Sequence, residues 1–415
     1  MRGINWGGNH TYRSAEVRRP TELRELQSIV RSNSEVSAIA TRHSFNAIGD
    51  ASTLIDLSEL ATATMVDVDV ETVRCSPATT YAQLSAELAL HGRALHNLAS
   101  LPHISVGGAI STGTHGSGSR LGNLATAVEA IDLVVASGDV FTYRRGEPDF
   151  DGVVVGLGAL GLIVGVELRT EPHYTVTQTV YDGLDWQTLD DEFDAISTAS
   201  TSVSVFTRWA DAVGEVWCKQ RDDQPSSSPF DLTALEPAPG MRHPIAGAAP
   251  DACTVQLGRS GPWSERLAHF RSDAMPSMGN EIQAEFFVDR TVSAEVFAAL
   301  RSIGPQLDRV LLVSEIRTVA ADQLWMSPHH GRDSTAFHFT FRMDPDAVQQ
   351  AVDLIGSCVA GCHPRFHPSK ALPTGWQIAS TELDRFLELR ERLDPEQRFT
   401  TPWFRTHVAD RSSGA

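Results

Sequence analysis

The strongest constraint on this chain is a segment in which glycines alternate with small hydroxyl residues. It reads Ser105-Val106-Gly107-Gly108-Ala109-Ile110-Ser111-Thr112-Gly113-Thr114-His115-Gly116-Ser117-Gly118. Glycine lets backbone N–H groups come close to a phosphate, and the hydroxyls add hydrogen-bond donors with little bulk. Taken alone, the segment also suits a glycine-rich loop that only turns the chain. We expect this segment to cradle a diphosphate.

A second glycine-rich segment resembles a nicotinamide-binding fingerprint. Gly156-Leu157-Gly158-Ala159-Leu160-Gly161 has its spacing, and Asp182 follows about twenty residues later. The fingerprint requires a helix after its last glycine, whereas residues 162–168 are rich in β-branched side chains. The sequence therefore predicts a strand there and disfavours a nicotinamide site.

Length and charge exclude several classes of protein. A chain of 415 residues that is 41% hydrophobic can bury two cores, so two domains are expected. The formal net charge of −18 argues against nucleic acid or an anionic membrane as a partner. Because the N-terminus lacks an apolar signal and no stretch is long enough to span a bilayer, a cytoplasmic location is expected. The five scattered cysteines do not suit a disulfide framework.

Hydrophobic spacing predicts an α+β fold. Helices are predicted over 21–32, from Tyr81 to a stop at Gly92, and over 382–393. The other predicted segments are short strands at 36–40, 53–57, 131–135 and 153–155, a β-rich region from about 175 to about 370, and surface loops over 224–250.

Two polar pairs stand inside extended segments of the β-rich region. Glu315 and Arg317 are separated by one apolar residue, as are His338 and Thr340. Period two places each pair on one face of a strand. Glu315 and Arg317 suit hydrogen bonds to a polyol, and His338 suits proton transfer near neutral pH. A solvated face with a satisfied ion pair is the alternative.

A cluster near the end of this region suggests a metal site at first sight. His363 and His367 are four residues apart, but Pro364 and Pro368 disfavour the helix that would align them. Cys358 and Cys362 lack a second pair of ligands. No metal is expected.

Together these residues resemble the alditol (xylitol) oxidases of the vanillyl-alcohol-oxidase (PCMH-type) flavoprotein superfamily, over almost the whole chain. The similar stretches are 41–46, 97–106, 112–118, 158–161, 315–322, 331–333, 393–395 and 398–400. The resemblance implies an FAD-binding domain built from residues 1–173 and 374–415, with an inserted β-sheet substrate (cap) domain over 174–373.

The resemblance also assigns the cofactor contacts. His43 corresponds to the histidine that bonds covalently to FAD. The full set of implied FAD contacts is Ala38, Ile39, Ala40, Thr41, Arg42, His43, Ser44, Ser100, Ser105, Gly108, Thr112, Gly113, Thr114, His115, Val164 and His367. Relatives often have more glycine where this chain has Ala40, Thr41 and Arg42, and the bulk of an arginine disfavours left-handed backbone there.

The implied reaction is oxidation of the terminal hydroxyl of an alditol such as xylitol or sorbitol to the aldose, with O2 reduced to H2O2. His338, Lys370 and Arg317 correspond to catalytic residues. The substrate pocket corresponds to Ser100, Glu315, Arg317, Thr340 and Lys370. The enzyme is expected to be a monomer. Two alternatives remain, an aldonolactone oxidase or dehydrogenase of the same superfamily, and a flavin-binding protein without catalytic activity.

Overall fold

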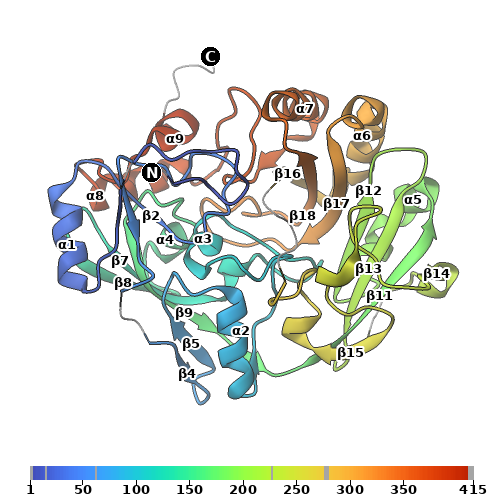
Figure 1. Ribbon diagram of the computed structural model, residues 1–415, viewed down its shortest axis with the longest axis horizontal. Helices are drawn as coiled ribbons and strands as arrows, with labels where there is room; N and C mark the ends of the chain where they lie inside the picture. Colours follow the sequence, from blue (N-terminus) through green and yellow to red (C-terminus); the bar gives the residue numbers. More distant parts are fainter. Residues whose placement is uncertain (1–2, 15, 61–62, 226–227, 275–279, 410–415) are drawn as a thin grey trace.

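The computed structural model describes residues 3–14, 16–60, 63–225, 228–274 and 280–409. Among these residues, helices and two large sheets are mixed, which confirms the α+β class (Figure 1). The helices are α1 (Leu23–Ser32), α2 (Tyr81–Leu90), α3 (Val106–Ser111), α4 (Phe150–Val154), α5 (Trp186–Ser197), α6 (Ser293–Leu307), α7 (Pro345–Cys358), α8 (Leu383–Leu393) and α9 (Pro402–Phe404). None of the described helices is long and apolar enough to span a membrane.

The N-terminal part contains two sheets of different kind. A parallel sheet has the order β1 (Val17–Arg18), β3 (Thr53–Asp56), β2 (Val36–Ile39). An antiparallel sheet has the order β4 (Met65–Asp67), β5 (Thr72–Cys75), β9 (Leu162–Arg169), β7 (Val128–Val134), β8 (Val140–Arg144). A smaller pair joins β6 (Arg93–Ala94) to β10 (Glu171–Pro172).

A nine-stranded sheet begins at Thr175, and three of its strands line the cavity described below. Its order is β14 (Glu236–Pro237), β11 (Thr175–Leu184), β13 (Gly214–Arg221), β12 (Ser202–Thr207), β17 (Leu311–Val319), β18 (Ser334–Arg342), β16 (Glu281–Asp289), β19 (Arg365–Phe366), and β15 (Arg259–Pro262) also pairs with β11. Figure 1 shows this sheet at the right of the molecule, with α6 and α7 above it and the five-stranded sheet at the lower left. The domain boundaries at 173 and 373 stay a prediction.

The two ends of the described chain pack together. The N–H of Val36 donates to the carbonyl of Arg398 at 2.8 Å, and the N–H of Ala136 donates to the carbonyl of Leu393 at 3.2 Å. Phe399 is buried in one hydrophobic cluster with Leu26 of α1. The C-terminal segment therefore packs on the N-terminal part of the fold.

Most predicted elements are confirmed, including the strand at 162–168, which is part of β9. Gly92, with a φ of +64°, follows α2 as expected.

One prediction was wrong. Residues 153–155 were expected to be a strand, but α4 occupies 150–154, and Phe150, Val153 and Val154 bury one face at helical spacing. The glycine-hydroxyl segment, which was predicted to cradle a diphosphate, contains the short helix α3 at Val106–Ser111, which buries Val106, Ala109 and Ile110.

Candidate active site

A cavity of about 330 Å³ lies between the N-terminal loops and one face of the nine-stranded sheet. This volume falls within the usual range for small-molecule sites. One wall comes from the loop after β2, from α3 and from residues 156–163. The other wall comes from β16, β17 and β18, and the loop at His367–Lys370 closes one side.

His43 lies in the loop after β2, and its ring stacks on Trp6 with centroids 4.9 Å apart. Its Nδ1 is buried without a hydrogen-bond partner among the described residues. Burial, followed by the nearby His103, lowers the pKa of His43 to about 4. The imidazole is therefore neutral near pH 7 and has a nitrogen available for a ligand.

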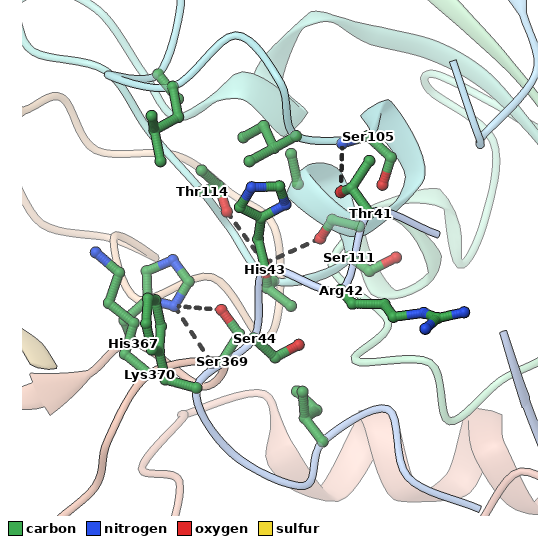
Figure 2. Close-up of a pocket in the computed structure, with 18 of the residues that line it drawn as sticks. Thr41, Arg42, His43, Ser44, Ser105, Ser111, Thr114, His367, Ser369 and Lys370 are labelled. Atoms are coloured by element: carbon green, nitrogen blue, oxygen red, sulfur yellow. Dashed lines mark hydrogen bonds between the residues drawn. The ribbon is translucent and has the colours of Figure 1, made fainter. Parts of the chain in front are cut away.

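Arg42, next to His43, adopts left-handed backbone with a φ of +59°. Its carbonyl accepts a hydrogen bond from the N–H of Trp6 at 2.8 Å, which holds this conformation. Figure 2 shows its side chain pointing away from His43. The arginine thus takes the backbone geometry that a glycine would adopt more easily.

The phosphate-binding interpretation of the glycine-hydroxyl segment rests on α3 and the loop after it. A Cβ at Gly108 would meet only the Ser105 hydroxyl, at 3.0 Å, so this helix face is open to the cavity. Hydroxyls of Thr112 and Thr114 also line the wall, 3.2 Å from each other. A cofactor with a diphosphate fits this donor set.

The opposite wall is polar because three neighbouring strands present one face to the cavity. Glu315 of β17 lies opposite His338 of β18, and His338 lies opposite Glu285 of β16. The Nε2 of His338 is 3.1 Å from the Oε1 of Gln283. On the reverse face, Phe286, Phe337 and Phe339 are buried and stacked.

Glu285 is the centre of the charge network, and sequence reasoning missed it. Its Oε1 is 2.6 Å from the Nη2 of Arg317 and 3.2 Å from the Nε2 of His115, and its Oε2 is 2.7 Å from the Nζ of Lys370. Burial alone would raise the pKa of Glu285, but Lys370, His115 and Arg317 lower it well below its usual range. The alternation Glu281, Gln283, Glu285 in β16 was the signal that could have identified it.

Charges also set the protonation of the other strand residues. Burial would raise the pKa of Glu315, but the Arg317 guanidinium and the hydrogen bond with His269 lower it below its usual range. Burial, followed by the positive charge of Lys370, lowers the pKa of His338 to about 3. The cavity therefore contains ionised carboxylates, a guanidinium and a neutral imidazole.

The structure brings most of the predicted site residues together. Those that line the cavity are Ala38, Ile39, Ala40, Thr41, Arg42, His43, Ser44, Ser100, Ser105, Gly108, Thr112, Thr114, His115, Glu315, Arg317, His338, Thr340, His367 and Lys370. Gly113 and Val164 are not part of this lining. A Cβ added to Gly113 would contact Pro328. Val164 packs against the hydrophobic cluster that contains Leu26.

The two histidines that suggested a metal site lie in different environments. His367 is buried at the cavity, where its Nδ1 is 3.1 Å from the Ser369 hydroxyl, whereas His363 is exposed. Among the described residues, no group of three or more His, Cys, Asp or Glu side chains is arranged to hold a metal ion.

Comparison with known proteins agrees with this site. Residues 14–144 match a family described as the FAD binding domain. The alditol oxidase of Streptomyces sp. (strain IKD472 / FERM P-14339) is 39% identical, over 97% of each chain. The L-gulono-1,4-lactone dehydrogenase of Mycobacterium tuberculosis is 28% identical, also over 97% of each chain. A crystal structure of cholesterol oxidase from B. sterolicum has the same fold, with a TM-score of 0.77 at 14% identity over 98% of this chain and 96% of that chain.

The residues fit FAD on structural grounds, because an unpartnered histidine nitrogen, an open glycine face and several hydroxyls border the same cavity. Fold and site define an FAD-binding oxidoreductase. Within that class, the chain belongs to the alditol oxidase family.

Proposed function

We propose that this chain oxidises the terminal hydroxyl of an alditol, such as xylitol or sorbitol, to the aldehyde of the aldose. The observation that carries the proposal is the network of Glu315, Arg317, Glu285 and Lys370 on the cavity wall. Dense charged donors and acceptors suit a chain of hydroxyls better than an aromatic ring. When bound, FAD would accept a hydride from the substrate carbon and pass the electrons to O2, which gives H2O2.

His338 and Lys370 have different roles in this proposal. His338 is neutral because burial and Lys370 lower its pKa to about 3, and it accepts the proton of the substrate hydroxyl as the hydride leaves the carbon, when that hydroxyl becomes much more acidic. Lys370 forms an ion pair with Glu285 at 2.7 Å, so it stays protonated and stabilises negative charge on the substrate oxygen. Arg317 does the same from β17, and Glu315, Thr340 and Ser100 hold further hydroxyls.

A covalent bond between His43 and FAD is part of the proposal. Support comes from the buried, unpartnered Nδ1 and from the lowered pKa, which leaves the ring neutral and nucleophilic. Denaturing the protein in acid tests it, because covalently bound flavin precipitates with the protein. Flavin that remains in the supernatant would refute the bond.

The substrate is tested by anaerobic mixing with xylitol, which should bleach the flavin absorbance, followed by peroxide detection in air. An aldonolactone oxidase or dehydrogenase is the second candidate, since the lactone dehydrogenase of M. tuberculosis matches over 97% of each chain. A panel of polyols and lactones separates the two. Turnover of lactones without turnover of polyols would contradict the proposal.

A further inference from the structure

A fully buried lysine lies behind Glu315, outside the residues assigned so far. Lys219 of β13 has no exposed surface. Its Nζ donates to the carbonyls of Leu267 at 2.5 Å and Ala268 at 3.2 Å, and it is 2.9 Å from the Nδ1 of His269. An ammonium has three donors and no acceptor, so the Nδ1 of His269 must accept the third hydrogen bond.

This contact fixes the tautomer of His269. With Nδ1 as acceptor, the neutral ring carries its proton on Nε2, which donates to the Oε1 of Glu315 at 2.7 Å. Burial, followed by the charge of Lys219, lowers the pKa of His269 to about 4 and keeps the ring neutral. The N–H therefore orients the Glu315 carboxylate without cancelling its charge.

Packing holds the His269 ring in place. It is in edge-to-face contact with Phe206 and Trp217, at centroid distances of 5.6 and 5.3 Å. The backbone N–H groups of His269 and Phe270 both donate to the carbonyl of Ser100, at 3.1 and 3.2 Å. One short segment thus contacts both Ser100 and Glu315.

We propose that His269 is a positioning residue that holds Glu315 in place to accept hydrogen bonds from the distal hydroxyls of the substrate, with Lys219 setting its tautomer. This inference rests on the proposed alditol oxidation. It predicts that His269 affects binding of the distal hydroxyls rather than the oxidation step.

The test is anaerobic flavin reduction at about pH 6, because burial lowers the pKa of Lys219 to about 7 and the ammonium dominates below that pH. The substrates are xylitol and 1,2-pentanediol, which keeps two hydroxyls and lacks the distal ones. In His269→Phe we expect the apparent Kd for xylitol to rise about tenfold, with the limiting rate unchanged within about twofold. The Kd for 1,2-pentanediol should not change.

Two further variants separate positioning from general damage. His269→Gln keeps an N–H donor and should restore most of the xylitol affinity. Lys219→Met should weaken xylitol binding in the same direction, and combining it with His269→Phe should add little, since both act through one hydrogen bond. Flavin content per protein is measured for each variant.

The possible failures are distinguishable. If the wild-type protein does not reduce its flavin with xylitol, the proposed function fails. If the wild type reacts but the His269→Phe variant loses flavin, loses affinity for both substrates equally, or loses only the limiting rate, the positioning role of His269 is overturned.

Discussion

At the scale of single residues, the buried Glu285 pairs with two cations of the cavity wall. It is 1% exposed and is paired with Arg317 and Lys370. Glu285→Gln removes the counter-charge of Lys370 and one of the two carboxylates beside the buried Arg317, so we expect the free energy of unfolding to fall by about 3 kcal/mol. Chemical denaturation measures this, with Asp308→Asn as the control, because the pair of Asp308 with Arg208 is exposed and should contribute less than about 1 kcal/mol.

The effect of Glu285 should also depend on pH. Its pKa in the folded protein is lowered well below the unfolded value near 4.5. Its contribution is therefore complete above pH 4.5 and is lost as pH falls through the lower folded pKa. A difference between wild type and Glu285→Gln that grows on acidification would contradict this assignment.

His338 gives a second prediction that depends on pH. Because its pKa is about 3, the imidazole is neutral throughout the range from about pH 5 to 7. The limiting rate of flavin reduction should show no acidic limb there, and His338→Asn should lower that rate roughly 100-fold at every pH. An acidic limb with a midpoint near the ordinary histidine value of 6.5 would be evidence against this assignment.

Substitutions at Arg42 can show whether its positive φ strains the loop before His43. The φ of +59° destabilises the folded state of an L-residue by about 1 kcal/mol, and glycine would remove this strain. Glycine also makes the unfolded chain more flexible, which stabilises the unfolded state by a similar free energy. Arg42→Gly should therefore leave unfolding and flavin content nearly unchanged, whereas the β-branched Arg42→Val should lower both. Flavin absorbance per protein gives the readout. Equal flavin content in both variants would mean that this backbone is not strained.

At the scale of elements, β16, β17 and β18 use one face to line the cavity and the other face to pack in the hydrophobic core. The cavity face is charged, while Phe337 on the other face is fully buried against Phe286 and Phe297. Phe337→Ala should cost about 3–5 kcal/mol of unfolding free energy. Phe141→Ala is the matched control, because this side chain is 48% exposed and should cost less than about 1 kcal/mol. Similar costs would show that the reverse face is not tightly packed.

At the scale of the whole molecule, the two walls of the cavity come from distant parts of the chain. FAD that binds only the folded protein stabilises it by mass action. In His43→Ala, each tenfold increase in free FAD above its Kd should add about 1.4 kcal/mol to the unfolding free energy. The wild-type protein with covalent FAD should not respond, and an equal response in both would contradict the covalent bond.

The sequence by itself determined the local features. Glycine and hydroxyl spacing indicated a segment that lines the cavity with donors suited to a diphosphate, and period-two alternation put Glu315 and His338 on strand faces that line the same cavity. These signals are readable because they depend on backbone geometry over a few residues. The helix at Val153 was missed because β-branched propensity outweighed its helical spacing.

Only the tertiary structure decided which charged side chains pair with each other. Glu285 and Lys370 are 85 residues apart, and Lys219 and His269 are 50 apart, yet each pair is in direct contact. Strand order, which local sequence does not encode, places β16 between β18 and β19 and so brings Glu285 beside Lys370. The protonation of His338 and His269 follows from that packing, because burial and neighbouring charges set the pKa.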